Sequence, residues 1–174
     1  MATGTIVLPV GAATLPDGSA SNAAPAVQRV KSSAAAPTPY FLQLAFDAST
    51  EEQAMWSFRM PADYASAPVL KVLYKMASAT ANGVVIEGRL AAVSDPDAQD
   101  VDAKAFAAAN TSSTSTVPGT AGHMNEISLS LTNADSVAAG DFVVVYLARD
   151  VAAGGDTATG DMEVIAVSIE YTTT

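Results

Sequence analysis

Four aspartates, Asp95, Asp97, Asp100 and Asp102, form the densest group of side chains able to do chemistry. Alternating carboxylates can bind calcium, a hard cation that prefers oxygen ligands. An EF-hand loop also needs glycine at its sixth position and glutamate at its twelfth, where a count from Asp95 finds Asp100 and Phe106. The motif fails, so the cluster is interpreted as a solvated loop in which an aspartate caps a short helix. We expect no metal and no cofactor.

Other catalytic groups are sparse. His123 is the single histidine, and nothing near it marks the nucleophile of a Ser-His-Asp triad. Two carboxylates could hydrolyse a glycoside, but no spacing singles out a pair among the many acids. The glycine-rich segment 154–160 lacks the lysine of a phosphate loop and precedes an expected strand, not a helix. The sequence therefore predicts that the protein is not an enzyme.

Composition and charge exclude several further classes. The chain of 174 residues has no cysteine, which rules out disulfides and thiolate metal sites and fits a reducing compartment. No apolar run approaches the ~20 residues that cross a bilayer, and the N-terminus lacks the pattern of a secretory signal. A net charge of −10 argues against binding to the phosphate backbone of nucleic acids. We expect neither a membrane nor a nucleic acid as partner.

The first 39 residues differ in composition from the rest. They are rich in Ala, Pro, Ser, Thr and Gly, and they carry Arg29 and Lys31 against one acid, Asp17. Such a segment cannot bury enough apolar surface to fold alone. We interpret residues 1–39 as an extended arm that docks on a body, its own or a neighbour's. Its predicted partner-binding residues are Ile6, Val7, Leu8, Val10, Val27, Arg29, Val30 and Lys31.

From residue 40 onward the apolar pattern has a period of two, which is typical of strands with one buried face. It predicts strands at 40–46, 54–60, 70–76, 84–92, 127–131, 142–147 and 163–171, with 111–117 as an eighth. A short alanine-rich helix is expected at 100–109. This number of short strands predicts an all-β fold, a two-sheet β-sandwich of jelly-roll type spanning residues 40–174.

The run Phe142, Val143, Val144, Val145 and Tyr146 is apolar on both faces of its expected strand. One face of a sandwich strand normally meets solvent. We therefore expect another subunit or the arm to cover the outward face, and the protein to be an oligomer.

Carbohydrate binding is the alternative from a different functional class, because β-sandwich modules bind sugars on exposed aromatic platforms. Trp56 is the single tryptophan and lies in phase with Phe58, which predicts a core position. The tyrosines are scattered along the chain. A carbohydrate- or receptor-binding module therefore rests on analogy of fold.

Several segments resemble one group of proteins in their order along the chain. They are Phe58–Tyr64 (FRMPADY), Phe106–Thr111, Ala138–Asp150 (AAGDFVVVYLARD) and Glu163–Tyr171 (EVIAVSIEY). Over about residues 40–172 the chain resembles the small β-sandwich virion proteins of tailed bacteriophages, among them capsid decoration (cement) proteins.

The resemblance implies a jelly-roll decoration protein, typically a homotrimer that binds the major capsid protein on the outside of a head and bridges capsomers. It implies a protein made in the host cytoplasm and located on the capsid surface of the virion. Members of the group carry no catalytic residues, so none are transferred to this chain. A head fibre, tail or baseplate sandwich would share most of the same pattern.

Overall fold

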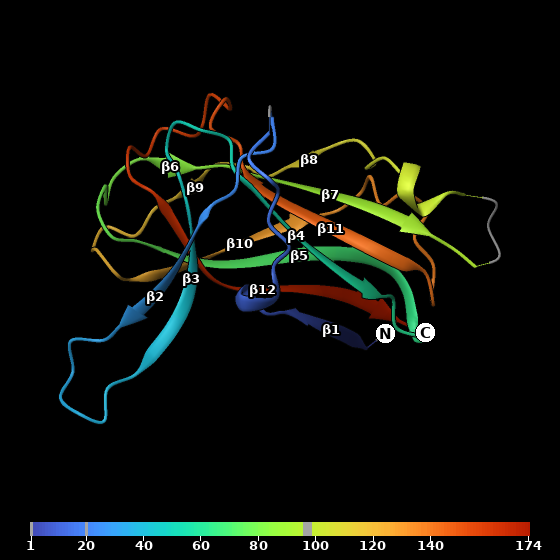
Figure 1. The fold of residues 1–174 in the computed structure, drawn as a ribbon, viewed down its shortest axis with the longest axis horizontal. Coiled ribbons are helices and arrows are strands. Elements are labelled where there is room, and N and C mark those ends of the chain that lie inside the picture. Colours follow the sequence, from blue (N-terminus) through green and yellow to red (C-terminus); the bar gives the residue numbers. More distant parts are fainter. Residues whose placement is uncertain (1, 20, 96–98) are drawn as a thin grey trace.

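The computed structural model describes residues 2–19, 21–95 and 99–174 and shows a two-sheet β-sandwich (Figure 1). In this part of the chain the large sheet runs β10 (Met124–Ser130), β5 (Tyr64–Met76), β12 (Met162–Thr173), β3 (Tyr40–Phe46) and β2 (Ala26–Lys31), with β1 (Thr3–Leu8) also paired to β12. The small sheet runs β4 (Gln53–Arg59), β11 (Phe142–Arg149), β7 (Ile86–Val93) and β8 (Asn110–Thr111). A short ribbon pairs β6 (Gly83–Val84) with β9 (Ser115–Thr116), and η1 (Val10–Ala12) and η2 (Val101–Ala103) are single 3₁₀ turns.

Alternation along each strand explains the two layers. In β5 the side chains of Leu70, Val72, Tyr74 and Met76 are buried between the sheets, while Lys71 and Lys75 lie on the outer face. Each fully buried large apolar side chain stabilises the fold by about 1.5–3 kcal/mol. The predicted all-β sandwich is confirmed.

The predicted arm is part of this sandwich. β1 pairs with β12 so that Ile6 lies opposite Ile169, and Leu8 and Val10 are buried in the core. β2 pairs with β3 along its whole length. Both apolar clusters of residues 1–39 thus lie on strands that pair with their own chain, which decides between the two bodies, its own or a neighbour's, that the sequence left open. Strand pairing satisfies the backbone polar groups of a segment too poor in apolar side chains to fold alone.

The segment between β1 and β2 crosses from the large sheet to the small one and back. Thr14 forms a bridge with Met55 of β4, and Ala23 forms one with Glu52. The indole Nε1 of the buried Trp56 donates a hydrogen bond to the carbonyl of Pro9 at 2.9 Å. This segment therefore closes one edge of the sandwich beside β4.

The predicted strands from residue 40 onward match observed ones within a few residues, except that β5 begins at Tyr64, six residues before the predicted start. The eighth strand predicted at 111–117 is not continuous. The region holds the last residue of β8 and the two-residue β9. The helix expected at 100–109 is wrong, because only η2 is helical there. Burial overrides alanine propensity: the ring of Phe106 packs at 5.6 Å from that of Tyr146, and the Ala107 N–H donates to Leu90 at 2.9 Å.

Among the described residues, no helix is both long and apolar enough to span a membrane.

Candidate functional site

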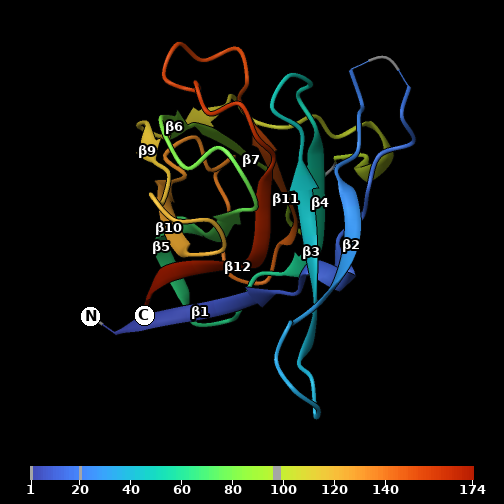
Figure 2. The same cartoon turned by 90° about the vertical axis from the view of Figure 1, so that its left-hand side faces the viewer.

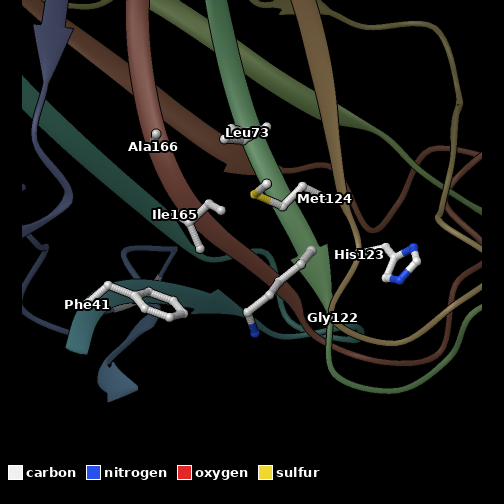
Figure 3. A pocket seen from close by; sticks show the side chains of 8 residues that line it. Phe41, Leu73, Gly122, His123, Met124, Ile165 and Ala166 are labelled. Atoms are coloured by element: carbon white, nitrogen blue, oxygen red, sulfur yellow. The ribbon is translucent and has the colours of Figure 1, made fainter. Parts of the chain in front are cut away.

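A groove of about 680 Å³ lies on the outer face of the large sheet (Figure 3). The residues that line it come from β3, β5, β12 and the start of β10, and most of them are apolar. They are Phe41, Leu73, Lys75, Gly122, His123, Met124, Ile165 and Ala166. A smaller hollow that shares Leu73 and Ala166 continues it toward Val7 of β1. We call these eight lining residues the sheet groove.

The sheet groove exists because β12 changes partners along its length. β3 pairs with Met162–Val164, whereas β1 pairs with Val167–Thr172. Between them, the register of β12 with β5 shifts at Val164/Ala166, which is the sign of a β-bulge. Ile165 and Ala166 therefore stand where β3 leaves the sheet. In Figure 2 the β2–β3 hairpin extends beyond the sandwich from this point.

The charged groups beside the sheet groove are already paired. Lys75 forms an ion pair with Glu163, and Gln43 Nε2 donates to Glu163 at 2.8 Å and to Gln28 at 2.7 Å. This row crosses β5, β12, β3 and β2 on one face. Within the described residues, Gln43 Oε1 is the buried side-chain atom left without a partner. A buried pair with its hydrogen bonds in place has little left to offer a ligand, so the groove presents mainly apolar surface.

His123 does not join a catalytic arrangement. Its ring points away from Met124 and Ile165 in Figure 3. Within the described part of the chain, its recorded hydrogen bond is a backbone one, from its N–H to the Thr120 carbonyl at 3.2 Å. We therefore assign His123 no role in proton transfer.

The predicted subunit-interface strand is β11, and it lies between β4 and β7. Val143 and Val145 face the core and are fully buried, which removes them from any interface. Tyr146 faces outward, but its own chain covers it. Its hydroxyl donates to Glu51 at 3.3 Å, Arg89 lies 5.6 Å from its ring, and burial, with nearby Glu87 and Glu51, raises its pKa. The expectation that a partner or the arm covers Tyr146 is therefore corrected.

The outer face of β11 stays partly open at its start. There a cavity of about 270 Å³, which we call the η2 pocket, lies between the small sheet and the η2 turn. It is lined by Ala91, Val93, Val101, Lys104, Phe106, Phe142 and Val144. Phe142 and Val101 remain exposed at its mouth. Two predicted interface residues, Phe142 and Val144, thus line this pocket.

The acidic cluster forms the predicted cap. Asp100 Oδ1 accepts a hydrogen bond from the Asp102 N–H at 3.0 Å at the start of η2. Asp97 lies outside the described residues. Among those described, no group of three or more His, Cys, Asp or Glu side chains is placed to hold a metal.

The second cluster of the predicted arm lies on the β2–β3 hairpin. The register places Arg29 opposite Leu42 and Lys31 opposite Tyr40, so these four side chains share one face with Val27. We call this set the hairpin face. Arg29 lies 5.9 Å from the ring centre of Tyr40. Val30 lies opposite Phe41 on the other face, which borders the sheet groove.

Several known structures resemble this chain in architecture at low sequence identity. No protein-family model matches the chain, and no curated protein matches its sequence. A family 35 carbohydrate binding module from Clostridium thermocellum is 10% identical, covering 95% of this chain and 97% of its own, with a TM-score of 0.48. The C-terminal CBM6 of LamC, a laminarinase from Zobellia galactanivorans, is 12% identical, with 95% and 98% covered and a TM-score of 0.40.

A third similar structure is the CBM27-1 of Caldicellulosiruptor saccharolyticus, solved with mannohexaose, at 7% identity, 95% and 96% coverage and a TM-score of 0.38. The sheets of this chain form an all-β sandwich, and its likeness to these carbohydrate-binding modules concerns architecture alone. None of the structures named here is a virion protein, so they do not support the expected resemblance to phage decoration proteins.

Proposed function

We propose that this chain is a non-catalytic structural protein that binds another protein through its sheet groove, as a decoration protein on the head of a tailed phage. The observation that carries the proposal is the chemistry of the groove. It is open and apolar, and the ion pair of Lys75 with Glu163 beside it is internally satisfied.

Such a surface suits an apolar segment of a folded partner. Sites for small polar ligands rely on a few convergent polar groups, which the groove lacks apart from the paired Lys75 and the outward-turned His123. Protein interfaces instead have an apolar centre depleted in charge. Met124 is 61% exposed at the wall of the groove, although it is a large apolar side chain. A covering partner would remove this surface from water.

The choice of the phage head as the partner rests on the sequence resemblance, which implies binding to the major capsid protein on the capsid surface. The net charge of −10 fits a protein that must stay soluble until it assembles. A rigid sandwich that binds through one apolar face would stabilise a shell by holding neighbouring capsomers together.

The test is reconstitution on purified heads that lack the protein. Met124→Glu places a charge in the groove and should weaken head binding at least about tenfold in cosedimentation, and it should abolish the rise in the melting temperature of the heads. Ser130→Glu is the matched control, because Ser130 is an exposed residue of β10 outside the groove. Equal binding by both variants, or no binding by the wild type, would overturn the proposal.

Carbohydrate binding is the second candidate, and one observation favours it. Phe41 is partly exposed along the groove, where its ring could stack on a sugar. A glycan array separates the two functions. Selective glycan binding that Phe41→Ala abolishes would replace the capsid proposal, whereas a blank array together with head binding would exclude the sugar.

A further inference from the structure

The hairpin face is only partly covered by its own chain, in which Leu42 lies beside Gly11 of η1. Tyr40 is 56% exposed and Leu42 is 41% exposed, with Val27 exposed beside them. Neighbouring side chains of a strand point to opposite faces, so these residues cannot share the sheet groove that Phe41 borders. The hairpin also reaches beyond the sandwich in Figure 2. Its apolar side chains are therefore available to a second molecule.

The hairpin face also carries positive charge that is not neutralised. Arg29 and Lys31 take part in no ion pair within the described residues, and Arg29 lies over the Tyr40 ring. Tyrosine and arginine, together with tryptophan, are enriched among the residues that dominate binding energy at protein interfaces. The face thus combines aromatic and aliphatic side chains with two cations. Nearly all acidic residues of the chain lie outside the first 39 residues, on the part that a second copy would present.

The η2 pocket has the opposite character. Phe106 and Phe142 line it, and Val101 is 52% exposed at its mouth. Asp100 and Asp102 are exposed on the same η2 turn and form no ion pair within the described ranges. Lys104 does not cancel them, because it is bound to Asp135 at 2.8 Å. The pocket is therefore apolar with an unpaired acidic rim.

We infer that the hairpin face of one copy binds the η2 pocket of a second copy, with Tyr40 and Leu42 packing against Phe106 and Phe142, and with Arg29 and Lys31 meeting Asp100 and Asp102. The charges decide between this pocket and the sheet groove. The lysines of the groove region already pair with Glu126 and Glu163, so it has no comparable unpaired acidic rim.

The placement of the two surfaces sets the kind of assembly. Figure 1 shows the hairpin and the η2 turn at opposite ends of the long axis, so the hairpin of one copy cannot reach the η2 pocket of the same copy. A contact between two different surfaces is heterologous, and it generates a ring where the rotation closes. The predicted homotrimer is the smallest ring of this kind with more than two copies. This inference is independent of the sheet groove and of its proposed partner.

Sedimentation velocity of the full chain tests the contact. Leu42→Glu on the hairpin and Val101→Arg at the pocket should each weaken self-association at least about tenfold. Ser130→Glu is the matched control for Leu42→Glu, because it adds the same charge at an exposed strand position outside both surfaces, and it should leave assembly unchanged. Circular dichroism confirms that each variant folds. A wild type that stays monomeric at high concentration would overturn the inference, as would variants that assemble normally.

Charge reversal tests the pairing itself. Arg29→Glu with Lys31→Glu should weaken assembly, and so should Asp100→Lys with Asp102→Lys. A chain that carries all four reversals should assemble again, since each copy then offers a matched hairpin and pocket. Failure of the fourfold variant to recover, with its fold intact, would show that these charges do not meet.

Cross-linking gives a direct readout, because the chain contains no cysteine. A chain with only Leu42→Cys is mixed with a chain carrying only Val101→Cys and treated with a short bifunctional maleimide. A covalent dimer of the two is expected, and replacing Val101→Cys by Met124→Cys should abolish it. A link to Met124 instead of Val101 would place the hairpin in the sheet groove and refute the inference. Head binding depends on Met124 and assembly on Leu42, so the two proposals fail separately.

Discussion

Two arginines of this protein lie in opposite environments. Arg149, beside the loop from β11 to β12, is buried and paired, whereas Arg29, on the β2–β3 hairpin, lies over the Tyr40 ring without an ion pair among the described residues. Arg149, at the end of β11, is fully buried and donates to Asp156 through Nε at 3.0 Å and NH2 at 2.8 Å. It also donates to the carbonyls of Gly160 at 2.7 Å and Ala158 at 2.5 Å. One side chain therefore fixes the loop that carries the chain from one sheet to the other.

The guanidinium of Arg29 in the β2–β3 hairpin has no such ion pair among the described residues. Arg29 rests on an exposed ring, and the tip is closed by a backbone hydrogen bond from the Ser32 N–H to the Pro39 carbonyl at 3.0 Å. A guanidinium that is fully satisfied inside the fold determines geometry, whereas one left on an exposed apolar face is available for binding. The comparison separates the part of the molecule that holds its shape from the part that we propose reaches a partner.

The largest expected effect comes from Arg149→Met. Asp156, whose side chain is 2% exposed, would keep a buried charge without its partner, and two carbonyls would lose their donor. Breaking a buried pair in this way should lower the free energy of unfolding by about 3–5 kcal/mol. Urea denaturation measures it. Arg59→Met is the control, because the exposed Arg59 side chain bonds only the Gly140 carbonyl among the described residues, and it should cost less than about 1 kcal/mol. Equal losses of unfolding free energy in the two variants would show that the buried pair of Arg149 does not stabilise the fold more than an exposed arginine does.

Two leucines on the same face of β3 sharpen the comparison within the hairpin. Leu44 is fully buried where β3 joins the sheet, and Leu42 lies outside it. Leu44→Ala should cost about 2–5 kcal/mol, whereas Leu42→Ala should cost less than about 1 kcal/mol in the monomer. Thermal unfolding at low concentration checks both values. A large cost at Leu42 would mean that the hairpin is packed against its own body.

Gly4→Ala tests whether β1 docks on its own chain. A methyl group at Gly4 would collide with the ring of Tyr171, which cannot easily move because its hydroxyl donates to Asp63 at 2.9 Å. The expected loss of stability is about 1–3 kcal/mol. Gly119→Ala is the control, since an added carbon there meets nothing within 4 Å. If both changes are neutral in a denaturant titration, β1 does not occupy this position.

The smallest effect concerns the turn before β4. Hydrogen bonds from Ser49, followed by one from Thr50, lower the pKa of Asp47. A lowered pKa adds stability above the unfolded value of about 3.9 and loses it as the pH falls through the folded value. Asp47→Ala should therefore cost less than about 1 kcal/mol near neutral pH, and the gap from wild type should close in acid. A gap that is independent of pH would exclude this origin.

The errors made from sequence have specific physical causes. Residues 1–39 contain too few large apolar side chains to predict strands. β1 and β2 form nevertheless, because backbone N–H and C=O groups of β12 and β3 are available to pair with theirs. The alanines of 100–109 favour a helix locally, but Phe106 gains more by packing on Tyr146. In both cases a distant part of the chain outweighs local preference.

The sequence by itself determined the alternation of the strands, the sandwich, the core position of Trp56 and the cap at Asp100, because each depends on neighbours a few residues away. Only the tertiary structure decided where the exposed apolar surface gathers. The sheet groove needs β12 to exchange β3 for β1 at a bulge, and the η2 pocket needs Phe106 and Phe142, far apart in the chain, to line one hollow on the small sheet. Registers between distant strands set such features, and no local pattern encodes them.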